Sequence, residues 1–253
     1  MSLLHCLRIL LAISAGLWVI PADAAITLGT ASSAEAAVGT PNTLSYSHVV
    51  EASANAVIVC LAERDTNASG FTVDTASVTI GGQAATQLIG QFNGVSIRSV
   101  LFYKLAPPTG TQTIAVTGDT GGERLVVATV ALQGVAQTST FNTAAGAGTT
   151  AVTDMDINTL ASAVGEVAVM CGAIRTSAVT PSPDATAPTS TELVDVAHTD
   201  STSVRVFMYT ESGASTSIDM RVDASASADW AGTAVSIRAG TANTRRREVI
   251  WLP

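Results

Sequence analysis

The sequence predicts an all-β protein, a two-sheet antiparallel β-sandwich with about six strands in each of two halves. Three observations lead to this fold class. Short segments either alternate between apolar and polar residues or run continuously apolar, and turn residues separate them. Ala, Thr, Ser, Val and Gly dominate the composition, and no stretch after the first 24 residues has the 3.6-residue periodicity of a helix. The pattern of strands and turns also occurs twice.

The repeated pattern is clearest between residues 95 and 134, which match a segment 106 positions later in the chain. Apolar residues fall on apolar residues, and the closing glycine falls on a glycine: Val100 on Val206, Leu101 on Phe207, Tyr103 on Tyr209, Ile114 on Met220 and Gly134 on Gly240. Earlier in each half the offset is 111, because Cys60 corresponds to Cys171. This duplication predicts two pseudo-repeats, at about 42–136 and 151–240.

About six strands in one half would leave a hydrophobic sheet face bare, so we expect the halves to pack face to face as one sandwich over residues 25–240. A half that is poor in aromatic residues would also have a thin core for independent stability. Two separate small sandwiches joined by residues 137–150 are the alternative.

The expected strands of the first half follow one another with short turns. Residues 25–40 predict an arm or a first edge strand, and residues 44–49 alternate as a half-buried strand does. The run 55–61 (NAVIVCL) is continuously apolar and β-branched, which favours a central strand buried on both faces. The other expected strands are bounded by Gly- and Pro-containing turns, and they cover 76–80, 84–89, 96–105, 111–117 and 124–132.

The second half repeats this order after residues 137–150 (QTSTFNTAAGAGTT), which predict a flexible linker or a crossover between sheets. Residues 151–158 alternate, and the apolar run 166–174 (EVAVMCGAI) corresponds to NAVIVCL. A loop with three prolines follows at 177–188. The remaining expected strands cover 192–197, 204–209, 217–222 and 230–237.

Residues 1–24 have the pattern of a secretion signal. Arg8 precedes an apolar run at 9–20, Pro21 ends the run, and Ala22-Asp23-Ala24 has the small residues that a signal peptidase accepts. The run is short for a membrane-spanning helix, and an uncleaved anchor is the alternative. We expect a mature chain that begins at Ala25 with no membrane span. It would be extracellular, on the cell surface or periplasmic, or on a virion surface if a phage encodes it.

The charge and the end of the chain bear on partners. The net charge is -8 with a pI of about 4.7, which argues against a nucleic-acid partner because phosphates require clustered cations. The basic cluster Arg245, Arg246 and Arg247 lies in the tail, 241–253, ahead of an apolar tip with Trp251. This tail could donate an edge strand to a neighbouring subunit, and a frayed or self-docked terminus is the alternative.

The order of core strands and turns resembles that of a jelly-roll, lectin-like (concanavalin-like) β-sandwich module of bacterial exported proteins and phage surface or fibre proteins. The motifs that carry the resemblance extend over about 26–240 and are TIGG, LFY, PPTGT, TIAVT, LVVATVALQGV and WAGTAVSIR. They are motifs of turns and core strands. The resemblance therefore implies a fold, and it implies no catalytic residues.

Cys60 and Cys171 are the two cysteines of the expected mature chain. In an oxidising compartment two cysteines suggest one disulfide, and an internal two-fold axis could bring these equivalent positions together. Two free, buried thiols that behave as small hydrophobic residues are the alternative. The sequence leaves both open.

Other residues with chemical potential are few. Asp65, Asn67 and Asp74 share a loop and are weak candidates for binding, including for Ca²⁺, which needs several oxygen ligands. His48 and His198 are expected to be ordinary strand or turn residues, because no further zinc ligands are suitably spaced.

No nucleophile elbow or paired catalytic carboxylates stand out in the sequence. We therefore expect a non-enzymatic structural or adhesive surface module, which self-assembles or binds a surface partner and has no cofactor. A lectin-like module that binds glycans is the alternative, and it would need exposed aromatic residues or loop carboxylates.

Overall fold

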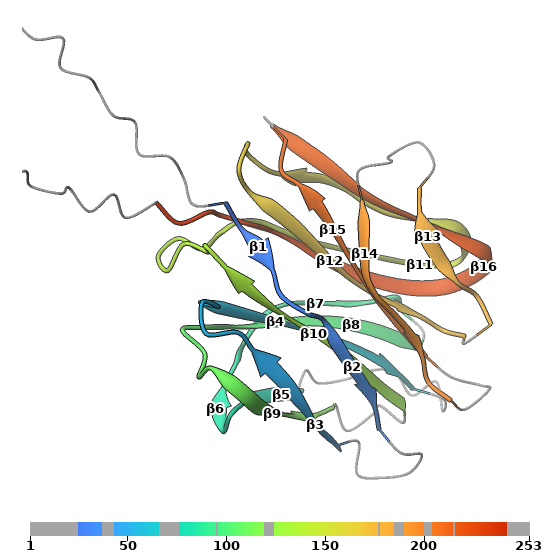
Figure 1. Cartoon of the computed structure of the whole chain (residues 1–253). Helices are drawn as coiled ribbons and strands as arrows, with labels where there is room; N and C mark the ends of the chain where they lie inside the picture. Colours follow the sequence, from blue (N-terminus) through green and yellow to red (C-terminus); the bar gives the residue numbers. More distant parts are fainter. Residues whose placement is uncertain are drawn as a thin grey trace, which may run out of the picture.

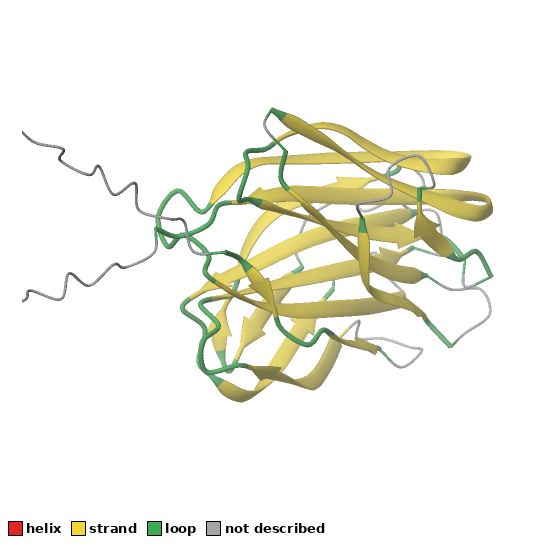
Figure 2. Ribbon diagram, turned by 45° about the horizontal axis from the view of Figure 1, so that its top comes forward, coloured by secondary structure: helices red, strands yellow, loops and turns green. Residues whose placement is uncertain are grey.

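The computed structural model describes residues 25–36, 43–65, 76–94, 96–118, 124–176, 178–184, 190–199, 204–214 and 216–241. Within these ranges the protein is all-β, as predicted, with antiparallel strands and no helix (Figures 1 and 2). Sixteen strands are present where about twelve are expected from turn spacing. Part of the excess comes from strands of only two or three residues. The predicted signal, 1–24, and the tail from residue 242 onwards lie outside the described residues.

The first half builds a large sheet and a small one. The large sheet has the order β1-β10-β4-β8-β7, with β2 also paired to β10. Its strands are β1 (Thr27–Leu28), β2 (Ser32–Glu35), β4 (Ala56–Arg64), β7 (Thr86–Phe92), β8 (Ile97–Leu105) and β10 (Arg124–Gln133). The predicted arm is therefore an edge of this sheet. The small sheet has the order β3-β9-β5-β6, formed by β3 (Thr43–Val50), β5 (Ser77–Ile80), β6 (Gln83–Ala84) and β9 (Gly110–Thr117).

The second half is one sheet of order β11-β16-β12-β15-β14, with β13 also paired to β16. Its strands are β11 (Phe141–Ala161), β12 (Val167–Ile174), β13 (Pro181–Pro183), β14 (Thr191–Ala197), β15 (Arg205–Ser212) and β16 (Ser217–Ile237). The stretch 137–150, predicted as a bridge, is thus strand from Phe141 onwards.

The two long strands of the second half serve two layers. β11 and β16 have 21 residues each, and their pairing has register shifts between Thr149 and Val152 and between Val152 and Asp154. On one side of this irregularity β16 also pairs with β12, and on the other side it pairs with β13. On the side that pairs with β13, buried residues of the hairpin, including Met155 and Met220, join a core cluster with Phe207 and Tyr209 of β15. The hairpin therefore folds over the sheet to which it belongs.

Three core clusters separate the layers. One lies between the small and the large sheet of the first half, one within the folded-over sheet of the second half, and one between the two halves. β4 explains the arrangement, because Val57, Val59 and Leu61 face the first cluster whereas Ile58 and Cys60 face the cluster between the halves. This confirms a central strand buried on both faces.

The expectation of two sheets is wrong in its number, since the described residues form three. Strands that are apolar on both faces, such as β4 and β12, need a covering layer on each side. Each half therefore adds a second layer of its own besides packing against the other half. Each half has a core of its own, as two separate sandwiches would, and the halves also share a core, as a single sandwich would.

Candidate functional site

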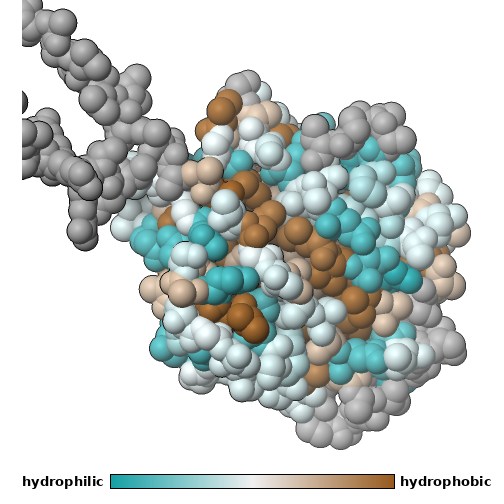
Figure 3. Space-filling view, viewed as in Figure 1, coloured by the Kyte–Doolittle hydropathy of each residue, from teal (hydrophilic) through white to brown (hydrophobic). Residues whose placement is uncertain are grey.

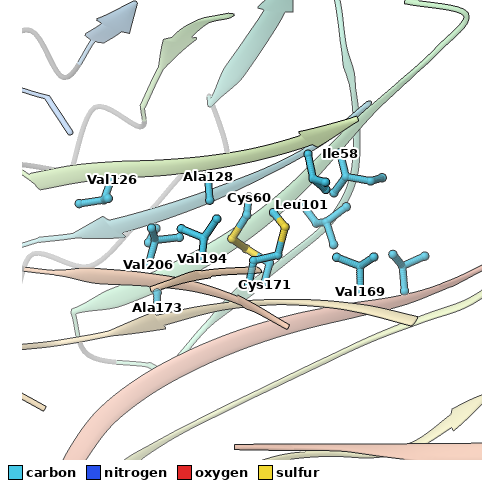
Figure 4. Packing of buried hydrophobic residues seen from close by; sticks show 14 of the residues in the cluster. Ile58, Cys60, Leu101, Val126, Ala128, Val169, Cys171, Ala173, Val194 and Val206 are labelled. Carbon is cyan, nitrogen blue, oxygen red and sulfur yellow. A yellow bond between two sulfur atoms is a disulfide. The ribbon is translucent and has the colours of Figure 1, made fainter. Parts of the chain in front are cut away.

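The junction between the halves is centred on a disulfide between Cys60 of β4 and Cys171 of β12, with the Cα atoms 5.4 Å apart. Both residues are fully buried. Figure 4 shows the sulfur–sulfur bond between strands of the two halves, surrounded by aliphatic side chains such as Ile58, Leu101 and Val169. The pair lies on the central strand of each large sheet.

A small polar group next to the disulfide is internally satisfied. The Ser99 hydroxyl donates to the carbonyl of Cys171 at 2.9 Å and lies 3.2 Å from the Thr233 hydroxyl. Ser99 and Thr233 are completely buried. Thiol–disulfide exchange requires access for the attacking thiolate, so this buried bond has the environment of a structural disulfide.

The predicted calcium ligands are only partly described. Asp65 is buried just after β4, and its backbone N–H donates to the carbonyl of Ser96 at 2.9 Å. Asn67 and Asp74 lie outside the described residues. Within the part of the chain that is described, no group of three or more His, Cys, Asp and Glu residues could hold a metal ion. The tail residues Arg245, Arg246, Arg247 and Trp251 also fall outside it.

Two ion pairs join neighbouring strands, one of them fully buried and the other partly buried. Glu63 and Arg98 are register partners on β4 and β8 and form an ion pair with side chains 0% and 5% exposed. Arg205 donates to Asp195 at 2.5 Å, although burial is the larger influence and raises the pKa of Asp195. The cation beside each carboxylate offsets part of the cost of removing that carboxylate from water.

The aromatic side chains are also used inside the fold. Trp230, Tyr209, Phe102 and Phe207 are among the largest fully buried residues. Tyr103 packs edge-to-face on Phe141 with ring centroids 4.6 Å apart, and Tyr46 contacts the Thr129 hydroxyl at 2.5 Å. Every aromatic residue in the described ranges is buried or half-buried. None presents a fully exposed ring on which a sugar could stack.

The carboxylates of the folded-over hairpin lie on its outer face, as their spacing predicts. Asp154 and Asp156 alternate with buried Met155 and Ile157 of β11. On the paired strand Asp219 alternates with buried residues in the same way. Burial, the first cause, raises the pKa of Asp156, and the carboxylates of Asp154, Asp184 and Asp219 raise it further against the opposing effect of Arg221.

The surface has two features that sequence reasoning missed. A hydrophobic band crosses the face seen in Figure 3, between the positions of β1–β2 and β14 in Figure 1. At one end of these strands a shallow groove of about 220 Å³ is lined by Ile26, Leu28, Val167 and Glu211, among others. The second feature is a pocket of about 320 Å³ between β2 and β3.

The pocket between β2 and β3 is lined by Thr30, Ala31, Ser32, Ser47, His48, Val49 and Glu51. Ser32 and His48 are 16 residues apart in a segment without a recognisable motif, and only the packing of β2 beside β3 brings them together. The sequence signal available was the histidine at an inward position of an alternating strand.

Comparisons with known proteins give no relative: no family model, curated protein or solved structure matches the chain. In the described ranges, no helix is long and apolar enough to cross a membrane.

Proposed function

We propose that this protein is an exported, non-enzymatic structural module of a cell or virion surface, built from an internal duplication. The observation that carries the proposal is the buried disulfide between Cys60 and Cys171, which joins the two halves at their shared core. Disulfides form and persist in oxidising compartments, and this agrees with the signal pattern of residues 1–24.

The proposed duplication is supported by the strand order of the two halves. The strand order of the second-half sheet corresponds to that of the two first-half sheets if β11 and β16 are each counted as two segments. The equivalent strands are β10 and the second part of β16, β4 and β12, β8 and β15, β7 and β14, β3 and the second part of β11, β9 and the first part of β16, and β5 and β13. In the first half these segments are separate strands, such as β9 and β10, whereas in the second half the corresponding segments are joined within the continuous strands β11 and β16.

The absence of enzymatic activity is inferred from where chemically capable groups lie. Glu63 and Asp195 are each paired with an arginine, the disulfide is buried, and the largest aromatic side chains fill the cores. Groups placed in this way contribute to stability, and we infer that they do not act on a substrate. The proposed relationship to jelly-roll, lectin-like modules rests on the turn and strand motifs and agrees with the all-β architecture.

We further propose that the tail joins copies of the protein. The described chain ends beside β1, because Gly240 donates to the carbonyl of Gly134 and Thr27 pairs with Gln133. The hydrophobic band begins at this end of β1, and β14 on its other side is an edge strand of its sheet. An apolar tip behind three arginines would complement both the band and the acidic body.

Light scattering on the chain 25–253 and on a version that ends at Gly240 tests this function. We expect the longer chain to assemble and the shorter chain to be a monomer of the same fold. Two compact monomers would remove assembly through the tail. Equal assembly of both versions would also contradict the role of the tail.

A further inference from the structure

The pocket between β2 and β3 opens at the side of the first sandwich, next to the core between its two sheets. Ser32 lies on β2 of the large sheet and His48 on β3 of the small sheet. Hydroxyl groups of Thr30, Ser32 and Ser47 belong to residues that line it, and Val49, which is 55% exposed, adds an apolar edge. A volume of about 320 Å³ is at the lower end of the range for small-molecule sites.

His48 carries one nitrogen that the protein leaves unpaired. Its side chain is 2% exposed, and its Nδ1 lies 2.7 Å from the Ser32 hydroxyl. Its Nε2 is buried and has no hydrogen-bond partner. Burial lowers the pKa of His48, with the Glu51 carboxylate as the smaller, opposing influence, so the ring is neutral near pH 7.

Glu51, which also lines the pocket, carries a second unpaired atom. Its Oε1 accepts from the backbone N–H of Thr30 at 3.0 Å, whereas its Oε2 is buried without a partner. Gly29 makes room for this carboxylate, because a Cβ at that position would lie 2.4 Å from both carboxylate oxygens.

Two residues that line this pocket each carry an unpaired buried polar atom, and both atoms require an explanation because burial has removed their hydrogen bonds to water. We propose that the pocket is a binding site for a neutral, polyhydroxylated ligand of the size of one sugar residue. One ligand hydroxyl would donate to Glu51 Oε2, and a neighbouring hydroxyl would pair with His48 Nε2.

The chemistry of the two atoms selects this ligand class. The tautomer of His48 decides whether Nε2 donates or accepts, and a hydroxyl group can serve either role. An ammonium group could satisfy Nε2 in only one tautomer. An anion would meet a carboxylate and a neutral ring with no cation among the lining residues.

A metal ion fits the pocket less well. One imidazole nitrogen and one carboxylate make only two protein ligands, and the described residues hold no cluster of three or more suitable groups. The proposed site is independent of the structural role argued above, because ligand binding in this pocket requires neither assembly nor the tail.

The test uses imidazole ¹⁵N spectra of the chain 25–253, which retains only His48 and His198 of the three histidines. The methyl glycosides of glucose, galactose, mannose and N-acetylglucosamine are the probes. We expect at least one to shift the His48 signals saturably, while those of His198, whose Nε2–H donates to the Ala36 carbonyl, stay in place. No saturable shift with any probe, or equal shifts of both rings, would overturn the proposal.

Variants distinguish binding at this site from non-specific binding of the glycosides to the protein. Glu51→Gln keeps the shape and removes the charged acceptor, and we expect binding to weaken about tenfold. Gly29→Ala should weaken it as well, by displacing the carboxylate without changing any hydrogen-bonding group. Glu211→Gln, in the groove on the other side of β1, is the matched control and should leave binding unchanged. Equal affinity of Glu51→Gln and the parent chain, or a response of His48 to Zn²⁺ but to no glycoside, would overturn the site.

Discussion

Cys60 and Cys171 are 111 residues apart and are joined on the central strands of the two large sheets. The bond crosses the core that the halves share, and its two strands belong to different sheets. Each half also has a core of its own. The disulfide therefore fixes the association of the halves more than the fold of either one.

Removal of the disulfide should lower stability and leave the fold intact. Cys60→Ala/Cys171→Ala opens a long covalent loop, and we expect the free energy of unfolding to fall by about 2–5 kcal/mol. Urea denaturation followed by circular dichroism measures the change. Reductant should shift the midpoint of the parent chain and not that of the double variant. An unchanged midpoint in the double variant would show that the bond contributes nothing.

The buried ion pair of Glu63 and Arg98 should behave non-additively. Arg98→Leu leaves a buried carboxylate without its cation, and we expect a loss of about 3–5 kcal/mol in unfolding free energy. Glu63→Leu/Arg98→Leu removes both charges and should cost less than the single change. A double-mutant cycle by chemical denaturation measures the coupling, and additive costs would contradict it.

Gly172 on β12 should not tolerate a side chain. A Cβ there would lie 1.8 Å from the Phe207 ring, so we expect Gly172→Ala to lower the free energy of unfolding by about 1–3 kcal/mol or more. Gly146→Ala is the control, since the nearest atoms to its Cβ would belong to the flexible side chain of Gln91. In the double variant Gly172→Ala/Phe207→Leu the leucine has no ring to meet the new Cβ. We expect this variant to recover part of the lost free energy of unfolding. Thermal melting decides, and equal effects of the two glycine changes would refute the steric argument.

The acidic outer face of the folded-over hairpin predicts a pH-dependent gain. The pKa of Asp156 is raised above its ordinary value of 3.8, so its ionisation destabilises the folded state as pH rises through the raised pKa. Asp156→Asn should therefore melt at a higher temperature than the parent at pH 7, and the two should converge below about pH 3.

The control for this pH dependence is Asp229→Asn. Asp229 pairs with Arg175 at 2.8 Å and accepts from the backbone N–H of Ala151, so its loss should lower the melting temperature at pH 7. A difference between Asp156→Asn and the parent that persists unchanged at low pH would contradict the electrostatic cause.

The strands could be predicted where the local sequence pattern is compatible with only one kind of secondary structure. The apolar, β-branched run at 55–61 becomes β4, and Gly81 and Gly82, both with positive φ, form one of the Gly-containing turns expected between strands. The bridge at 137–150 was not predictable in this way. Its small residues are typical of linkers, yet here they permit close packing, because a Cβ at Gly148 would lie 3.1 Å from the carbonyl oxygen of Trp230.

The pocket between β2 and β3 could not be predicted, because contacts between residues far apart in the sequence create it. The sequence placed His48 on an alternating strand, and nothing in it indicated that the N-terminal arm would bring Ser32 to the ring. The second layer of each half was missed because its strands are ordinary alternating segments whose partners lie far away in the sequence.

We propose that the two halves are covalently joined once the chain has been exported, and the intact mass of the protein secreted by a bacterial host is the measurement that tests this proposal. We predict a chain that begins at Ala25 and is lighter than its reduced form by two hydrogen atoms, the difference expected for a bond between Cys60 and Cys171. A mass that retains residues 1–24, or one that is unchanged by reduction because both thiols are free, would contradict the claim.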